Sequence, residues 1–392
     1  MVLHLNKQSS ELFIRIPIPF TNKSKNHQKT THHQIQISRR RKPPHISSVS
    51  HDHHHLSKPL QQSTTITTTT KNCIPKQEEE EMEEDIKSGL KFVRGKKLLS
   101  QLSTWGIGGP CNYFVQVSDQ TQLLSAIRYC GEHSIRFLII GKGSNCLFDD
   151  LGFDGCVILN RIEFIERIEP GMYRMGSGYP LNRLAVRCSS EGFTGLEFAA
   201  GVPGTVGGGA YMNAGANGQE ISDAIYSVEI VRTDGRHETL NRNDLTFGYR
   251  TSSFQAMEDL AAIVAVTFQL KPSESARERQ QAYLTRRKLS QPLVERSAGS
   301  VFQNPSGVGF SAGELIEKAG LKGFRVGGAM VSEIHANFLI NCGGSTSRDM
   351  LQLINLVRDK INQKFGIQLK QEIRYVHPYN GFDPNRNDLP TL

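Results

Sequence analysis

The chain has 392 residues, of which 38% are hydrophobic, and a formal net charge of +8 at pH 7. This length is too great for one ordinary domain and fits two or three, and no run approaches the roughly 18 apolar residues that a membrane-spanning helix needs. Residues 1–75 hold 11 Lys and Arg and two acidic residues, so the rest of the chain carries a formal charge of −1. We therefore expect no nucleic-acid partner, because such a protein carries the basic excess on its folded body, and no membrane association.

Residues 1–75 have the composition of an organelle transit peptide. They are rich in Ser, Thr, His, Lys and Arg and poor in acids, and a segment this polar is expected to be disordered. A plastid stroma is the expected destination, with the mitochondrion as second choice. The histidine run at 51–55 can bind a metal, but a polar tract without structured surroundings is the simpler interpretation. The acidic residues 76–87 are predicted to form a solvated linker.

The seven cysteines form no C-x-x-C pair and no zinc-ligand spacing. This pattern is typical of free thiols in a reducing compartment, and most of these residues are expected to be small members of a core. We therefore predict no metal site.

Helix-like and strand-like segments alternate between residues 88 and 378. Apolar spacing and candidate caps predict helices over residues 121–133, 180–191, 273–290, 311–319 and 345–365. Short apolar or alternating runs predict strands over residues 136–140, 173–178, 227–233, 262–270, 336–341 and 372–376. The result is an α+β fold in which the polar helix 273–290 links two domains. The tail 379–392 is rich in Asn, Asp and Pro and is predicted to be loose.

Three glycine-rich segments are candidates for ligand binding. The longest, residues 197–216, contains six Gly and one Pro, although each glycine costs about 0.5–1 kcal/mol of ordering entropy. It suits a flat ring or a phosphate lying against backbone, and a glycine-lined helix crossing is the structural alternative. The turn 141–145 can point N–H groups at an anion, or it is an ordinary strand-to-helix turn. A third corner contains Gly176 and Gly178, and three such corners suggest a dinucleotide.

Polar residues with possible chemical roles stand in three later segments. Tyr249 and Arg250 lie beside small polar residues, and a guanidinium suits a carboxylate or phosphate, although a surface arginine fits the pattern equally well. Ser300 follows a glycine at a strand start and can donate a proton, but without a neighbouring histidine a structural serine is the commoner case. Glu372 and Arg374 share one face of the last strand, either as a salt bridge or as part of a site.

Together these segments resemble the UDP-N-acetylenolpyruvoylglucosamine reductases, the MurB-type peptidoglycan enzymes. The segments that match the family lie in the family's order, at residues 102–110, 141–145, 200–208, 212–216, 247–250, 299–302, 335–338 and 372–374. Their spacing is similar to that of the shorter subtype, which lacks an inserted tyrosine loop.

The resemblance implies a fold and an activity. Residues 88–272 would form a two-subdomain FAD-binding module of the vanillyl-alcohol-oxidase (PCMH) type, and residues 273–378 a C-terminal α+β substrate-binding domain. The implied ligands are non-covalent FAD, NADPH as co-substrate and a UDP-sugar, whose enolpyruvyl group is reduced to give UDP-N-acetylmuramate. We expect a monomer. The alternative is a flavin-binding homologue of the same fold with another substrate or no catalysis.

The resemblance also assigns roles to individual residues. Ser300 is implied to be the general acid, Glu372 the assisting carboxylate and Arg250 the group that steadies the developing charge. The implied substrate contacts are Tyr249, Asn304 and Arg374. The expected cofactor-binding residues are Gly141, Lys142, Gly143, Ser144, Asn145, Gly176, Gly178, Gly201, Pro203, Gly204, Thr205, Gly207 and Gly208.

Overall fold

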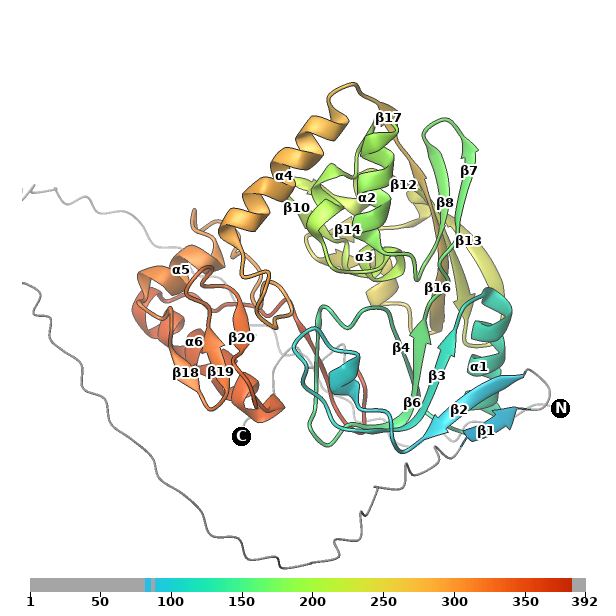
Figure 1. The fold of residues 1–392 in the computed structure, drawn as a ribbon, viewed down its shortest axis with the longest axis horizontal. Coiled ribbons are helices and arrows are strands. Elements are labelled where there is room, and N and C mark those ends of the chain that lie inside the picture. Colours follow the sequence, from blue (N-terminus) through green and yellow to red (C-terminus); the bar gives the residue numbers. More distant parts are fainter. Residues whose placement is uncertain (1–81, 86–88, 383–392) are drawn as a thin grey trace, which may run out of the picture. The chain divides into compact units, whose positions relative to one another are not determined.

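The computed structural model describes residues 82–85 and 89–382, and Figure 1 shows the arrangement of their helices and strands. The predicted transit peptide and the histidine run at 51–55 lie outside these residues. The fold begins with a five-stranded sheet in the order β1-β2-β3-β6-β4. Its strands are β1 (Met82–Asp85), β2 (Leu90–Arg94), β3 (Cys111–Val117), β6 (Phe153–Asn160) and β4 (Phe137–Ile140).

The first three strands of this sheet are antiparallel, and β6 pairs in parallel with both β3 and β4. The interior strand β6 is almost entirely buried, as its apolar run requires. Because β1 pairs with β2, four residues of the segment predicted to be a solvated linker belong to the sheet instead. Helix α1 (Gln120–Glu132) buries Leu123, Ala126, Ile127 and Cys130, a spacing that places them on one face of the helix.

A second five-stranded sheet follows, in the order β13-β12-β16-β8-β7, and all of its neighbouring strands are antiparallel. Its strands are β13 (His237–Asn241), β12 (Ile225–Arg232), β16 (Leu260–Gln269), β8 (Met172–Gly176) and β7 (Ile165–Glu169). Helix α2 (Leu181–Ser190), helix α3 (Val206–Met212) and the 3-10 helix η2 (Glu197–Gly201) share one hydrophobic core with this sheet. Four short strands form the pairs β9 (Phe193–Thr194) with β17 (Lys271–Pro272) and β10 (Gly215–Ala216) with β11 (Gln219–Glu220).

A two-residue hairpin and several single turns of helix complete this part of the chain. The hairpin consists of β14 (Phe247–Gly248) and β15 (Thr251–Ser252). The remaining 3-10 turns are η1 (Leu99–Gln101), η3 (Ile221–Asp223), η4 (Arg242–Asp244) and η5 (Ser253–Gln255).

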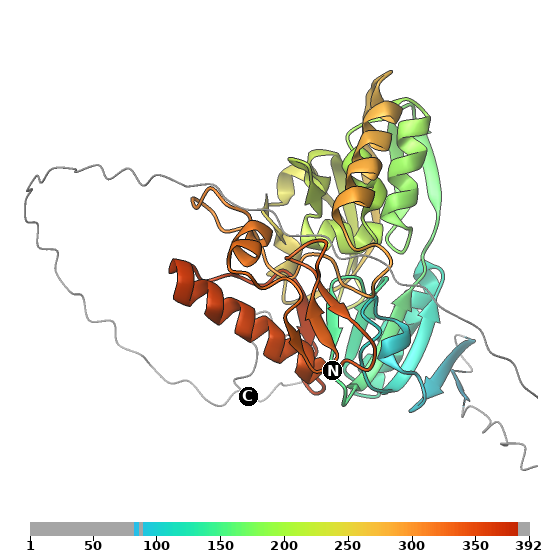
Figure 2. The ribbon, with the colours of Figure 1, turned by 60° about the vertical axis from the view of Figure 1, so that its left-hand side comes forward.

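The long helix α4 (Ala276–Ser290) leads to the C-terminal domain and packs against α2 and η2; Figure 2 shows α4 in orange beside α2 in green. The domain contains the antiparallel sheet β18-β19-β20 and two helices. Their bounds are β18 (Arg325–Val326), β19 (Ala329–Val331), β20 (Leu339–Asn341), α5 (Ala312–Lys318) and α6 (Ser347–Phe365). Side chains cap both helices: Ser311 accepts a hydrogen bond from the Glu314 N–H, and Thr346 from the Asp349 N–H.

Several contacts join the C-terminal domain to residues near the first sheet, including a strand pairing and a buried hydrogen bond. Strand β21 (Arg374–Val376) pairs in parallel with β5 (Cys146–Phe148). The indole of the fully buried Trp105 donates a hydrogen bond of 2.7 Å to the Leu339 carbonyl. Strand β21 therefore lies beside the chain segment that follows the glycine turn 141–145, which directly precedes β5.

The predicted helices all appear, as α1, α2, α4, α5 and α6, and the predicted strands appear as β4, β8, β12, β16, β20 and β21. Two further expectations were wrong. Helix α3 lies within the glycine-rich segment, where no helix was predicted. Residues 379–382 of the predicted loose tail are packed, since Arg136 donates a hydrogen bond to the Tyr379 carbonyl and Phe382 lies against a hydrophobic core.

The six cysteines within the described part of the chain are free, and four of them are buried. In the same residues, no helix combines the length and the apolar character needed to cross a membrane.

Candidate active site

One cavity of about 670 Å³ is bounded by the ends of both five-stranded sheets and by the C-terminal domain. Its volume lies within the usual range for pockets that bind small molecules and cofactors. The predicted site residues on its wall are Gly141, Lys142, Gly143, Ser144, Asn145, Pro203, Gly204, Thr205, Gly207, Gly208, Arg250, Ser300, Glu372 and Arg374. Segments separated by more than two hundred positions in the sequence therefore face one space.

Two glycine-rich loops from different subdomains meet at this cavity. A Cβ added to Gly141 would lie 2.5 Å from the Thr205 hydroxyl, so the two loops are in direct contact there. In contrast, a Cβ added to Gly204 would have no atom nearer than 3.8 Å, and this part of the wall is open backbone. Burial lowers the pKa of Lys142, and the nearby charges of Arg183 and Arg161 lower it further. This concentration of positive charge and bare backbone fits the diphosphate and flat rings of a dinucleotide such as FAD.

Three glycines predicted to bind the cofactor are not part of the cavity wall. A Cβ on Gly176 would lie 2.1 Å from the Ile162 carbonyl oxygen, and one on Gly178 would lie 2.6 Å from the Ile162 nitrogen. These two glycines allow close packing of backbone on backbone, and Ser177 between them lines the cavity instead. A Cβ on Gly201 would lie 2.4 Å from Cδ of Arg287, so this glycine makes room for an arginine stem.

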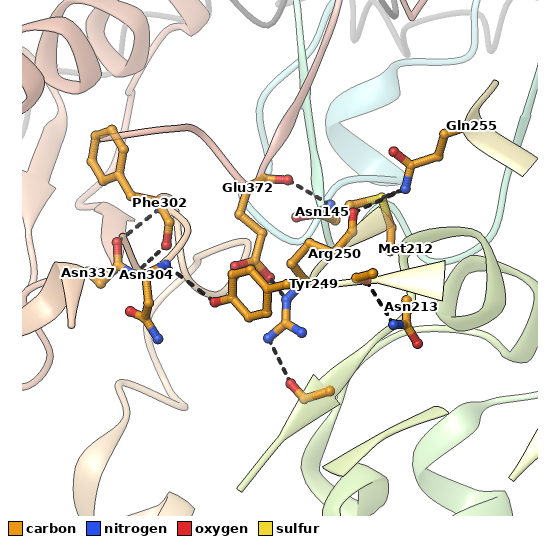
Figure 3. Close-up of polar contacts among 12 residues, drawn as sticks. Asn145, Met212, Asn213, Tyr249, Arg250, Gln255, Phe302, Asn304, Asn337 and Glu372 are labelled. Carbon is orange, nitrogen blue, oxygen red and sulfur yellow. Dashed lines mark hydrogen bonds and ion pairs between the residues drawn. The ribbon is translucent and has the colours of Figure 1, made fainter. Parts of the chain in front are cut away.

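Arg250 and Glu372 form the central polar contact of the site. Nε of Arg250 donates a hydrogen bond of 2.6 Å to Oε1 of Glu372, and the two side chains are only 15% and 16% exposed. Another guanidinium nitrogen of Arg250 donates to the Gly215 carbonyl at 2.8 Å. Burial raises the pKa of Glu372, and the charge and hydrogen bond of Arg250 oppose this rise. Figure 3 shows both side chains converging on one space from different domains.

The backbone of Arg250 adopts a left-handed conformation with φ of 58°. Tyr249 and Arg250 are the two turn residues of the β14–β15 hairpin, where glycine or asparagine normally takes a positive φ. Two side chains from other segments stabilise the hairpin. The Asn213 side chain donates a hydrogen bond of 2.9 Å to the Gly248 carbonyl, and the Gln255 side chain donates one of 3.2 Å to the Arg250 carbonyl. Backbone strain of this kind concentrates at functional sites.

Ser300 lies on the wall of the same cavity, at the start of a segment that is bonded on both sides. It forms an antiparallel bridge with Phe338, and the next residue, Val301, accepts a hydrogen bond of 2.7 Å from the Glu372 N–H. The chain segments of Ser300 and Glu372 are therefore neighbours. Within residues 89–382 the Ser300 hydroxyl has no hydrogen-bond partner, which leaves it available to a ligand.

Arg374 lines the cavity between two aromatic rings. Its guanidinium carbon lies 5.8 Å from the ring centre of Tyr211 and 5.3 Å from that of Phe382. Cation–π contacts of this kind hold the side chain while leaving its N–H donors free. Neither ring was predicted to take part in the site. The one signal for Phe382 was that an aromatic residue stands in a tail otherwise rich in polar residues and Pro.

Tyr249 and Asn304 lie beside the cavity and not on its wall. The Tyr249 hydroxyl accepts a hydrogen bond of 3.3 Å from the Asn304 N–H, as Figure 3 shows. The side-chain oxygen of Asn304 accepts from the Ala312 N–H at 3.0 Å, at the beginning of α5. The two residues thus connect the hairpin that carries Arg250 to the C-terminal domain.

Sequence reasoning missed several further wall residues. The buried side chains of Asn160 and Ser177 are joined by a hydrogen bond of 2.7 Å at the ends of β6 and β8. Arg287 reaches the wall from α4, which its polar composition suggested to be only a linker, and Gln291 reaches it from the extended backbone just after the helix. No local pattern marked the two residues, because Gln291 lies outside the helix and only the fold brings both to the cavity.

Comparisons with known proteins agree with this arrangement. A family model described as an FAD binding domain matches residues 111–241, and the model for the C-terminal domain of UDP-N-acetylenolpyruvoylglucosamine reductase matches residues 291–376. The chain is therefore an FAD-binding module followed by a C-terminal domain, as predicted.

Similar proteins are matched over almost their whole length. The UDP-N-acetylenolpyruvoylglucosamine reductase of Protochlamydia amoebophila is 47% identical over 283 residues, which cover 72% of this chain and 93% of the relative. That of Chlamydia abortus is 44% identical over 287 residues, covering 73% of this chain and 95% of the relative. The crystal structure of the reductase (MurB) from Thermus caldophilus has 32% identity and a TM-score of 0.60, and the match covers 75% of this chain and 99% of that one. The chain belongs to the UDP-N-acetylenolpyruvoylglucosamine reductase family.

Proposed function

We propose that the protein uses NADPH and non-covalently bound FAD to reduce the enolpyruvyl group of UDP-N-acetylglucosamine enolpyruvate to UDP-N-acetylmuramate, a peptidoglycan precursor. The observation that carries this proposal is the convergence of Arg250, Ser300 and Glu372 on the cavity that the glycine-rich loops also line. The names of relatives that are 44% and 47% identical over nearly their whole length support the same activity.

The wall of the cavity contains the residues that would hold the cofactor. Residues 141–145 and 203–208 offer backbone N–H groups, small side chains and the charge of Lys142. The chemistry that bound FAD supplies is two-electron hydride transfer from NADPH to the methylene carbon of the substrate.

The chain's own side chains would handle the charge and the proton. Addition of a hydride leaves negative charge next to the substrate carboxylate, and the Arg250 guanidinium stabilises it. Ser300 donates the proton that completes the lactyl group at the adjacent carbon. Glu372 holds Arg250 through the 2.6 Å hydrogen bond and assists at the other end of the substrate. Arg374 binds the substrate with the N–H donors that its aromatic neighbours leave free, and Tyr249 and Asn304 contact the substrate at the edge of the cavity.

The purified protein loaded with FAD tests this function directly. Anaerobic NADPH should bleach the flavin absorption, and the enolpyruvyl UDP-sugar should then restore it. A flavin that bleaches but stays reduced would indicate a different acceptor, and a protein that takes up no FAD would contradict the proposal altogether.

We also propose that residues 1–75 direct the protein to the plastid stroma. The support is their composition, with 11 basic and two acidic residues. A fluorescent protein fused behind these residues should accumulate inside plastids, and its accumulation in mitochondria or the cytosol would contradict this address.

A further inference from the structure

One face of α4 is turned toward the FAD-binding module and is fixed there by a buried ion pair. Glu197 in η2 is 1% exposed and accepts hydrogen bonds of 3.1 and 2.8 Å from the Arg279 guanidinium. Arg287 stands about two turns after Arg279 on α4, and Gln291 directly follows the helix with an extended backbone. Both residues line the cavity.

The Arg287 side chain reaches the cavity through the space above Gly201. A Cβ at that glycine would lie 2.4 Å from Cδ and 3.1 Å from Nε of Arg287, so any other residue there would displace the arginine. Gly201 was predicted to contact the cofactor. In the structure it has a different role, because the absence of a side chain leaves room for the aliphatic part of Arg287.

Arg287 is a partly buried residue whose buried Nε–H has no protein partner among the described residues. This Nε–H donates to no acceptor among the described residues, and the side-chain oxygen of Gln291, four residues later, is likewise buried and without a hydrogen-bond partner. No carboxylate within residues 89–382 forms an ion pair with Arg287. Burial lowers the pKa of Arg287, but a guanidinium remains charged in proteins. A buried N–H donor that makes no hydrogen bond is unfavourable, the more so on a charged group, and we therefore expect a ligand to accept from Arg287.

We propose that Arg287 and Gln291 form a ligand-binding pair in which Arg287 donates to an anionic oxygen, phosphoryl or carboxylate, while Gln291 accepts from a neighbouring N–H or O–H group of the same ligand. Two molecules of the proposed function carry such groups side by side, FAD and the enolpyruvyl UDP-sugar. The second of these sources rests on the proposed function, whereas the first requires only the FAD-binding module.

Two dissociation constants, measured without turnover, test the pair. FAD binding to the FAD-free protein is followed by quenching of flavin fluorescence, and UDP-sugar binding to the oxidised, FAD-loaded protein by the change in flavin absorbance. Arg287→Gln should weaken one of the two constants by about 10- to 100-fold, with a smaller salt dependence than in the wild type. Arg287→Lys should recover part of the loss. The constant that changes identifies the ligand.

Further variants separate ligand binding from a structural role. Gln291→Glu should weaken the same constant, because the new carboxylate pairs with Arg287, and Gly201→Ala should do so by displacing the arginine stem. Arg286→Gln is the matched control, because this exposed neighbour on α4 is not on the cavity wall. If folded Arg287→Gln and Gln291→Glu proteins both bind FAD and the UDP-sugar within twofold of the wild type, the proposal is wrong. If the wild type binds no UDP-sugar, the proposed function fails, and the FAD measurement alone decides on Arg287.

Discussion

Arg250 and Glu372 are joined by a hydrogen bond of 2.6 Å although 122 positions separate them in the sequence. Arg250 stands in the turn of the β14–β15 hairpin, and Glu372 stands just before β21, the strand that pairs with β5. The hydrogen bond between them forms only where the FAD-binding module and the C-terminal domain meet. The pair therefore couples the assembly of the domains to the formation of the site.

The left-handed backbone of Arg250 separates its catalytic from its structural contribution. Arg250→Ala and Arg250→Gly both remove the guanidinium, and each should lower kcat by about 100- to 1,000-fold. Glycine adopts a φ of 58° without the penalty that alanine incurs, so Arg250→Gly should be more stable than Arg250→Ala by about 0.5–1 kcal/mol. Steady-state kinetics and urea unfolding measure the two effects. Equal stability of the variants would argue against strain at this turn.

Ser300 should act in only one half of the reaction. Its hydroxyl faces the cavity without a partner among the described residues, and removal of a general acid typically slows its step by about 100- to 10,000-fold. Ser300→Ala should therefore reduce the flavin with NADPH at the normal rate but reoxidise it slowly with the enolpyruvyl substrate. Stopped-flow absorbance resolves the two steps. Equal slowing of both would remove Ser300 from the proton transfer.

The raised pKa of Glu372 predicts how the stability of the FAD-free protein varies with pH. Because burial raises this pKa in the folded state, the folded protein retains the proton more strongly than the unfolded chain. The contribution of the protonated Glu372 to the free energy of unfolding is complete below the ordinary glutamate pKa of about 4.3. It is lost as the pH rises through the pKa of Glu372 in the folded protein. Between these two pKa values, the wild type should therefore lose stability relative to Glu372→Gln as the pH rises. Above the folded pKa, the difference in unfolding free energy between the two proteins should stay constant. Urea unfolding at a series of pH values checks this, and a wild type that gains on the variant with rising pH would contradict it.

The ion pair between Glu197 and Arg279 should stabilise the position of α4. Glu197→Gln keeps the side-chain shape but removes the charge from hydrogen bonds to Arg279, the Thr194 hydroxyl and the Gly195 N–H. We expect a loss of about 1–3 kcal/mol of unfolding free energy at neutral pH. Burial raises the pKa of Glu197, but these hydrogen bonds outweigh it and leave the pKa lowered.

The lowered pKa of Glu197 also predicts how the loss of stability in Glu197→Gln depends on pH. The stabilisation is present above the ordinary glutamate pKa and disappears as the pH falls through the lower folded value, so wild type and Glu197→Gln should converge in acid. Asp234→Asn is the control, because the Asp234–Arg236 pair is exposed and its loss should leave the stability unchanged. A Glu197→Gln protein as stable as the wild type at neutral pH would show that α4 is held by packing alone.

Local patterns were sufficient for most of the secondary structure. Apolar spacing marked α1 and α2, and polar caps marked α5 and α6, because these signals act between residues close together in the chain. Helix α3 was missed for the opposite reason. Its glycines have low helix propensity, but a Cβ at Gly207 would lie 2.8 Å from the Ser177 Cβ, so tertiary packing imposes both the glycine and the helix.

The kinds of residue that bind the ligands were also recognisable in the chain, since bare backbone, a guanidinium, a hydroxyl and a carboxylate suit the same chemistry in any fold. Which of them share a cavity was not, because the contacts that decide it join residues far apart. The glycine-rich segments contain glycines of two kinds, and only the neighbours in space distinguish Gly204, which leaves the wall open, from Gly201, which admits the stem of Arg287. Burial likewise depends on packing, so the raised pKa of Glu372 and the unpaired charge of Arg287 arise only when the domains have come together.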